Sequence, residues 1–167
     1  MAEPENKDTA PLDPEAPDGQ FAIHKVYTKD ISFETPNSPD IFRVDWRPEL
    51  DVQLFTNTSR LDVALYEVTL RITVTVKIEE KTAFLAEVNQ AGIFGSDEPQ
   101  EERLKYILGS FCPNILFPYA RETVSDLVSR GGFPQFLLAP VNFDAIYAKH
   151  LQETQGNDDS QAADAGT

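Results

Sequence analysis

The strict alternation of apolar and polar residues between Tyr66 and Ile78 is the feature that most constrains how this chain folds. Successive side chains of a β-strand point to opposite faces, so this period of two predicts a strand with one buried face and one hydrated face. Such a strand is typical of an antiparallel sheet that is covered on one side only. The apolar positions are Tyr66, Val68, Leu70, Ile72, Val74, Val76 and Ile78.

Three further segments complete the predicted sheet. We expect the other strands at Phe21–Phe33, Leu50–Phe55 and Thr82–Gln90. The last of these resumes the alternation, with one exception, because Leu85 shares the polar side of its strand with Glu87. The hydrated face of the sheet is therefore expected to carry one large apolar residue among charged ones.

After Asp97 the apolar residues recur at helical spacing. Acidic residues at 97–102 precede them, which is typical of the amino terminus of a helix. We expect this helix to continue to Val128 and to end at the glycine pair Gly131–Gly132. Because proline lacks a backbone N–H and collides with the preceding turn, the helix should restart or kink at Cys112–Pro113.

A last helix is predicted over Asn142–Gln152, with Asn142 placed to cap it. Because the strands come first and the helices follow, we expect an α+β fold, a four-stranded antiparallel sheet with helices packed on one face. The long edge strands of such a sheet invite pairing with another copy, so we also expect an oligomer.

The formal net charge of −14 lies mainly at the two ends of the chain. Residues 1–20 carry six acidic residues and one lysine, and residues 152–167 carry four acidic residues and no basic one. Because both ends are poor in large apolar side chains, we expect two disordered acidic tails around a single domain at residues 21–151. The negative charge disfavours nucleic-acid binding and favours a basic protein partner.

Few residues of this chain could carry out chemistry. The only histidines are His24 and His150, and the only cysteine, Cys112, is expected to be a buried apolar residue. Their spacing suits no zinc site, and the glycines form no phosphate-binding motif. We therefore expect no catalytic residue, no metal, no cofactor and no enzymatic activity.

The amino terminus has neither the basic start nor the apolar stretch of a secretory signal. The longest apolar runs also fall far short of the ~20 residues that a membrane-spanning helix needs. A lone cysteine is tolerated best in a reducing compartment. We therefore expect a cytoplasmic protein that does not insert directly into the membrane.

Large aromatic residues gather in the irregular, proline-bearing segments, at Phe33, Phe42, Trp46, Phe133, Phe136 and Phe143. Considered singly, each ring is expected to be a structural residue that packs on the far side of the helices, in a second hydrophobic core. Taken together, the rings indicate a groove that accepts apolar segments of another polypeptide.

Three segments closely resemble the SecB family of bacterial protein-export chaperones. They are YTKDISFETPNSP (Tyr27 to Pro39), CPNILFPYARE (Cys112 to Glu122) and SRGGFPQFLLAPVNFDAIY (Ser129 to Tyr147). The resemblance runs from about Phe21 to Leu151 and takes in TAFLAEVNQAGIF (Thr82 to Phe94). The two tails and the acidic stretch from Gly95 to Arg103 lie outside it.

This resemblance implies an ATP-independent holding chaperone. Proteins of the family keep precursor proteins unfolded and export-competent in the cytosol, and deliver them to the SecA translocation ATPase. The resemblance also implies a homotetramer, arranged as a dimer of dimers.

The resemblance assigns three sets of site residues. The SecA-binding surface falls on Asp30, Glu34, Leu85 and Glu87. The client groove is expected at Phe42, Trp46, Phe133, Phe136, Phe143 and Tyr147. Packing of the tetramer is expected to depend on Ala86, Val88 and Gln90, on the helix-facing side of their strand.

Three other interpretations of the sequence are possible. The chain could be an assembly scaffold whose aromatic loops are only core, which predicts no suppression of aggregation. It could be an enzyme using carboxylates at a subunit junction, which requires a pocket carboxylate with a raised pKa. It could also be a SecB-like chaperone adapted to toxin control, against which the set Asp30, Glu34, Leu85 and Glu87 argues.

Overall fold

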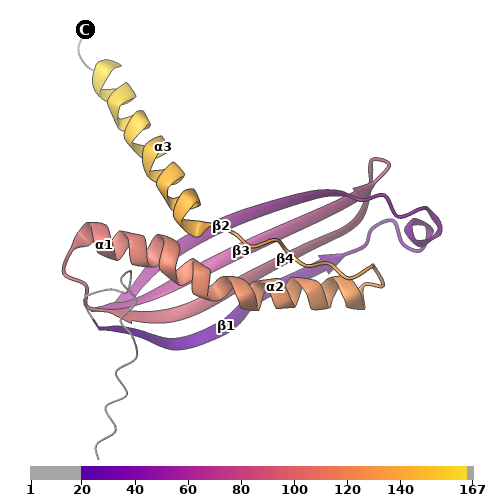
Figure 1. The fold of residues 1–167 in the computed structure, drawn as a ribbon, viewed down its shortest axis with the longest axis horizontal. Helices are drawn as coiled ribbons and strands as arrows, with labels where there is room; N and C mark the ends of the chain where they lie inside the picture. The colour runs from indigo at the N-terminus through magenta and orange to yellow at the C-terminus, as the bar shows by residue number, and fades with distance from the viewer. Residues whose placement is uncertain (1–19, 165–167) are drawn as a thin grey trace, which may run out of the picture.

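The computed structural model describes the backbone of residues 20–164 and the side chains of residues 20–156. Figure 1 shows a curved sheet with helices on one face. The elements are β1 (Phe21–Glu34), a 3-10 turn (Asp40–Arg43), β2 (Glu49–Asp62), β3 (Leu65–Ile78), β4 (Lys81–Ser96), α1 (Glu101–Tyr106), a π-helical turn (Ile107–Phe111), α2 (Cys112–Arg130) and α3 (Phe143–Asp164).

The sheet is antiparallel throughout, and its strands lie in the order β1-β4-β3-β2. Strands β3 and β4 are therefore central, and β1 and β2 form the edges. In β3 the even positions from Val68 to Val74 are fully buried, while Arg71 and Lys77 are exposed. The predicted alternation and the predicted α+β fold are both confirmed.

Two strands are longer than the sequence predicted. Strand β2 continues past Phe55 because Thr56 to Arg60 pair with β3, although they show no apolar alternation on this edge strand. Strand β4 continues past Gln90 to Ser96, which pairs with Phe21 of β1. In both cases the backbone hydrogen bonds come from a neighbouring strand, which the local sequence does not reveal.

Regular α-helix restarts at Cys112, as the sequence predicts. A single π-helical turn precedes Cys112 and joins α1 to α2. The N–H of Cys112 bonds to the carbonyl of Ile107, five residues back rather than four. Pro113, which has no N–H, then begins the regular helix, where the missing donor matters least.

Helix α2 covers the middle of the sheet and packs on β4 and β3 (Figure 1). Its buried face carries Leu116, Ala120, Val124 and Val128, which recur every four residues and are fully buried. Cys112 also lies in this core, and burial raises the pKa of its thiol. It therefore behaves as the buried apolar residue that the sequence predicted.

Helix α3 projects away from the sheet and contacts the rest of the fold through its first turns (Figure 1). It begins at Phe143, one residue after the predicted start, and the Asn142 side chain caps it by accepting the N–H of Ala145 at 3.0 Å. The backbone stays helical to Asp164, where the sequence predicts disorder after residue 151. The predicted amino-terminal tail, except residue 20, and residues 165–167 lie outside the described residues.

Across the described part of the chain, no helix combines the length and the apolar character needed to cross a membrane.

Candidate protein-binding site

Five aromatic rings from distant parts of the chain meet at one end of the sheet, on its helix-bearing face. Phe133 lies at the centre, with ring centroids of Phe42 and Phe84 at 5.0 Å and that of Trp46 at 5.9 Å. Phe33 lies at 6.5 Å from the same ring and stacks on Phe84. We call these five residues the aromatic cluster.

Two glycines bring Phe133 into the cluster. Gly132 has a φ of +86°, which reverses the chain directly after α2 in a conformation that glycine adopts freely. Gly131 lies against Phe33, so that a Cβ atom at this position would be only 2.3 Å from the ring. The glycine pair thus ends α2, as predicted, and also lets the aromatic rings approach the backbone.

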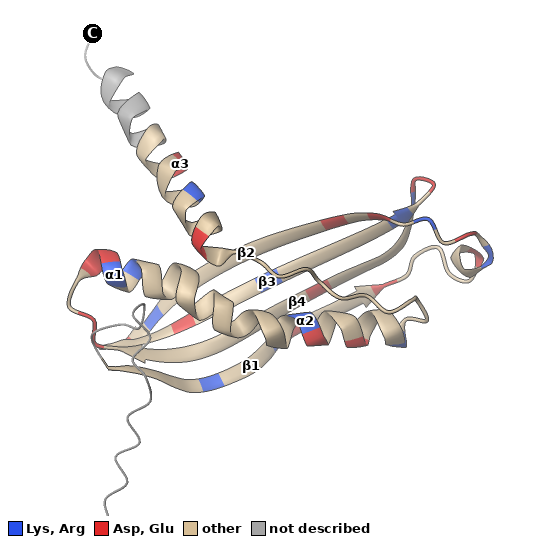
Figure 2. Cartoon of the chain, viewed as in Figure 1, with Lys and Arg blue, Asp and Glu red and all other residues tan. Residues whose placement is uncertain are grey.

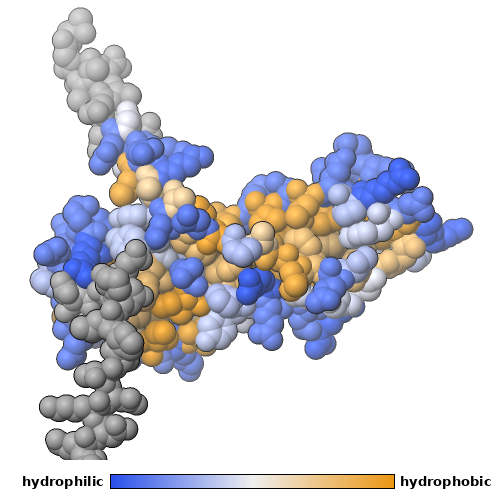
Figure 3. Space-filling view, in the orientation of Figure 1, coloured by the Kyte–Doolittle hydropathy of each residue, from blue (hydrophilic) through white to orange (hydrophobic). Residues whose placement is uncertain are grey.

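The aromatic cluster has a buried base and an exposed rim. Phe133 is only 7% exposed, whereas Phe42 is 49% and Trp46 40% exposed. A cavity of about 130 Å³ opens beside the cluster and is lined mainly by apolar residues, among them Trp46, Leu50, Phe84 and Phe136. Apolar surface also gathers over the segment that links α2 to α3 (Figure 3). This arrangement can accept apolar side chains of another polypeptide.

Of the six residues predicted for the client groove, four lie at the aromatic cluster or its cavity and two lie elsewhere. Phe42, Trp46 and Phe133 belong to the aromatic cluster, and Phe136 lines its cavity. Phe143 is buried instead against Phe117 of α2, with ring centroids 5.8 Å apart. Tyr147 packs edge-on against Tyr106 of α1, also at 5.8 Å. Phe143 and Tyr147 therefore attach α3 to α2 and α1, respectively.

A polar contact at the start of α3 completes this attachment and was not predicted from the sequence. Asp144 accepts hydrogen bonds from the Ser110 hydroxyl at 2.5 Å and the Tyr106 hydroxyl at 2.8 Å. These bonds hold the pKa of Asp144 below its usual value. Gly109 of the π-helical turn lies directly against the Tyr147 ring, where a Cβ atom would come within 2.8 Å.

The four residues predicted for SecA binding all lie on the face of the sheet opposite the helices, which we call the outer face. Residues paired across antiparallel strands share a face. Glu34 pairs with Leu85, and Asp30 pairs with Asn89, two positions beyond Glu87 on β4. The structure therefore brings Asp30, Glu34, Leu85 and Glu87 together on adjacent strands.

Charge is unevenly distributed over the outer face. We call one part of it the acidic half, defined by the outward positions of residues 30–34 in β1, 85–89 in β4, 71–75 in β3 and 51–55 in β2. Figure 2 marks the charges along these strands. The charged residues of the acidic half are Asp30, Glu34, Asp51 and Glu87, with Arg71 as its single base.

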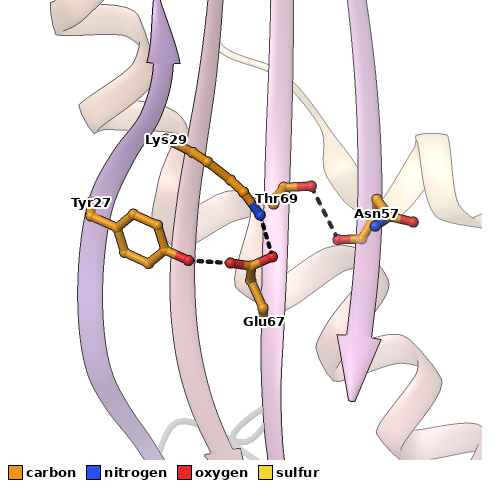
Figure 4. Close-up of polar contacts among 5 residues, drawn as sticks. All are labelled: Tyr27, Lys29, Asn57, Glu67 and Thr69. Atoms are coloured by element: carbon orange, nitrogen blue, oxygen red, sulfur yellow. Dashed lines mark hydrogen bonds and ion pairs between the residues drawn. The ribbon is translucent and has the colours of Figure 1, made fainter. Parts of the chain in front are cut away.

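Glu67, in the other half of the outer face, is closely paired. Its carboxylate accepts hydrogen bonds from Lys29 Nζ at 2.7 Å and from the Tyr27 hydroxyl (Figure 4). The bonds from Lys29 and Tyr27 hold the pKa of Glu67 below its usual value. Burial, together with the bond to Glu67, raises the pKa of Tyr27 to about 12. Glu67 is thus committed to contacts within the sheet.

Glu87, in the acidic half, is more loosely paired. It accepts a hydrogen bond from the Thr73 hydroxyl at 3.1 Å, and its distance to Arg71 Nε is 4.0 Å. Asp30 and Glu34 are exposed and make no ion pair within residues 20–156. The carboxylates of the acidic half are therefore available to a cationic partner, whereas Glu67 is not.

The residues predicted to affect tetramer packing face the helices, as expected. Ala86 and Val88 are fully buried in the core of the domain. Gln90 is also buried, where its amide donates to the carbonyl of Tyr27 at 3.0 Å and accepts from the Thr28 hydroxyl at 3.3 Å. All three residues support the position of β4 beneath the helices.

An α+β domain with a partly exposed aromatic cluster on one face and an acidic surface on the other belongs to the class of proteins that bind other polypeptides. The family described as preprotein translocase subunit SecB matches residues 14–154 of this chain. The protein-export protein SecB of Methylococcus capsulatus is 55% identical over 139 residues, covering 83% of this chain and 90% of that protein. The SecB of Idiomarina loihiensis is 51% identical over 167 residues, covering 99% and 100%. The chain belongs to the SecB family of protein-export chaperones.

A solved structure shares the fold. It is a SecB-like chaperone of Mycobacterium tuberculosis in complex with a ChAD peptide from the HigA1 antitoxin. The TM-score is 0.61 at 18% sequence identity, and the match covers 72% of this chain and 90% of that one. The family resemblance and the fold predicted from the sequence are therefore confirmed.

Proposed function

We propose that this protein is an ATP-independent holding chaperone of the cytoplasm, which keeps precursor proteins unfolded and delivers them to the SecA translocation ATPase. The observation that carries the proposal is the pair of exposed rings, Phe42 and Trp46, which rest on buried Phe133 beside an apolar cavity. Membership of the SecB family supports the same function.

The client groove comprises Phe42, Trp46, Phe133 and Phe136, whereas Phe143 and Tyr147 contribute by attaching α3 to Phe117 of α2 and Tyr106 of α1. Apolar burial contributes ~25 cal/mol per Å², so covering ~300 Å² of client contributes on the order of 7 kcal/mol before the cost of ordering the client. Because this term needs no specific sequence, the groove accepts many clients. A folded competitor buries the same apolar groups, so unfolded chains are selected.

The SecA-binding surface is the acidic half of the outer face, centred on Leu85 and Glu87 with Asp30 and Glu34 beside them. An apolar centre within a charged rim is typical of a moderate-affinity protein interface. The carboxylates attract a basic segment of SecA and steer its approach. Client and SecA thus bind to opposite faces of the sheet, so release of the client requires SecA to favour a client-releasing arrangement.

The working unit is a homotetramer, a dimer of dimers in which sheets pair at their edges and the long helices pack between them. Ala86, Val88 and Gln90 influence this packing by setting the position of β4 beneath α2. Substitution of these buried residues displaces the helix that contacts the other subunits.

The protein acts by binding alone, without an enzymatic step, a metal or a cofactor. An acid catalyst needs a carboxyl group with a raised pKa. The hydrogen bonds to Glu67 and Asp144 lower the pKa of both groups instead. Their donors belong to the fold and keep the carboxylates ionised.

The proposal is tested by diluting a denatured precursor protein into buffer with the purified chaperone, without ATP, and following aggregation by light scattering. The wild type should suppress aggregation, and a Phe42→Ser, Trp46→Ser variant should suppress it much less. Val63→Ser is the matched control, because Val63 is 79% exposed but lies in the turn between β2 and β3. A wild type that leaves aggregation unchanged would support the scaffold interpretation and overturn the proposal.

A further inference from the structure

Phe55 is an exposed aromatic residue on the outer face that none of the contacts above explains. It lies on edge strand β2, pairs with Arg71 of β3, and is 62% exposed. Its neighbours on the apolar side of the same strand, Val52 and Leu54, point to the helix-bearing face instead. Phe55 and Leu85 are thus the two large apolar residues of the acidic half, each among polar and charged neighbours.

Phe55 forms one wall of a shallow hollow of about 400 Å³ on the acidic half. The hollow is lined by Gln53, Leu54, Phe55, Arg71, Thr73 and Glu87. It therefore combines an aromatic wall with a carboxylate that the Thr73 hydroxyl holds in place and that Arg71 approaches only to 4.0 Å. A side chain with an apolar stem and a positive end complements these groups.

The hollow lies close enough to Leu85 to contact the same partner. Phe55 on β2 pairs with Arg71 on β3, which in turn pairs with Asn89 on β4. Asn89 is four residues from Leu85 along β4. With strands ~4.8 Å apart and a rise of ~3.3 Å per residue, Leu85 and Phe55 are separated by roughly 16 Å. A partner segment of about five extended residues spans this distance.

We propose that this hollow is a second anchor point for the cationic partner of the acidic half, which places an apolar side chain on Phe55 and a basic side chain on Glu87 in place of Arg71. The inference rests on the proposed SecA docking function and adds Phe55 and Arg71 to its surface. Charge decides the occupant. Two copies of this chain meeting through the acidic half would bring Asp30, Glu34, Asp51 and Glu87 against their equivalents, which repel one another.

The test measures binding of purified SecA to the complete, assembled protein by calorimetry at low salt. Phe55→Thr removes the ring but suits a strand, and should weaken SecA binding about fivefold to tenfold. Arg71→Ala removes the basic group nearest to Glu87, so the affinity for SecA should stay the same or increase. Val63→Thr is the control for an exposed apolar residue outside the acidic half and should have no effect. Client holding should be unchanged in all three variants.

A photoreactive phenylalanine analogue in place of Phe55 gives a second measurement that does not depend on stability. It should crosslink to SecA, and the same analogue at position 63 should not. If the wild type binds SecA and Leu85→Ala weakens binding, but Phe55→Thr does not and position 55 gives no crosslink, the hollow is not an anchor point. If the wild type itself does not bind SecA, the proposed docking function fails instead.

Discussion

The hydroxyl of Tyr27 on β1 donates a hydrogen bond to the carboxylate of Glu67 on β3, and so joins two strands that are not neighbours (Figure 4). Strand β4 lies between them, and it pairs Ala91 with Tyr27 and Ile93 with Glu67. The Tyr27 ring extends across β4 towards Glu67 (Figure 4), and the small Ala91 side chain lies beside it. This contact ties an edge strand to the middle of the sheet.

Tyr27→Phe removes the hydroxyl and leaves the ring. We expect the free energy of unfolding to fall by about 1 kcal/mol, the usual net contribution of such a hydrogen bond. Urea unfolding followed by circular dichroism measures the change. Tyr119→Phe is the control, since Tyr119 is exposed on α2, and should change stability little. An equal loss in both variants would mean that the contact with Glu67 contributes nothing.

The stability of the protein should depend on the ionisation of Glu67. Its pKa in the folded protein lies below its usual value of 4.5, mainly because of the hydrogen bond from Lys29. The unfolded chain therefore takes up a proton first as the pH falls, and the stabilisation by Glu67 is lost between pH 4.5 and its lower folded-state pKa. Above pH 4.5 this contribution is fully present.

Glu67→Gln should consequently show a smaller loss of stability between pH 7 and pH 3 than the wild type. The measurement is the urea midpoint at a series of pH values for both proteins. Parallel curves over this range would contradict the assignment.

Gly131→Ala should disturb the aromatic cluster, because the added Cβ atom would lie 2.3 Å from the Phe33 ring. Relief of this overlap displaces Phe33, and we expect a loss of stability of about 1–3 kcal/mol with weaker client holding. Gly156→Ala is the control, since nothing lies within 4 Å of a Cβ atom there. Thermal unfolding and the aggregation assay would reveal the difference, and equal behaviour of the two variants would contradict it.

Replacement of Leu85 and Glu87 together, as Leu85→Ala and Glu87→Gln, should abolish SecA association and leave client holding intact. Both residues lie on the outer face, away from the aromatic cluster. Co-sedimentation with SecA and the aggregation assay report on the two activities separately. Loss of both activities would show that the substitutions damage the fold or the oligomer instead.

Raising the ionic strength should weaken SecA binding more than client binding. At about 0.1 M salt the screening length is ~10 Å, and it shortens as salt is added. The exposed carboxylates of the acidic half are screened, whereas apolar contacts at the aromatic cluster are not. Titrations of both partners at several salt concentrations test this, and equal sensitivity would argue against a charge-led interface.

Much of the acidic half could be predicted from the sequence, because a strand assigns alternate residues to opposite faces. The position of Leu85 beside Glu87 on the polar side followed from that alternation alone. That Asp30 and Glu34 lie beside them depends on the register of β1 against β4, which includes two shifts. Neither shift has a local signal in the sequence.

The client groove was predicted less completely. All six residues are aromatic, but ring content alone does not tell which rings meet. Phe84, a strand residue that was not predicted, lies in the aromatic cluster. Phe143 and Tyr147, which were predicted, attach α3 to α2 and α1 instead. Phe84 could have been found, since it lies on the buried side of its strand and the rings from the loops need an apolar base.

By itself the sequence determined the local features of this protein: the alternating strand at Tyr66 to Ile78, the glycine end of α2 and the family to which the chain belongs. These follow from the geometry of a few consecutive residues and from matching motifs. The tertiary structure alone decided that Phe133 packs between Phe42 and Phe84, and that Glu67 is paired while Glu87 remains accessible. Such relations join residues far apart in the chain, and strand register and packing bring them together.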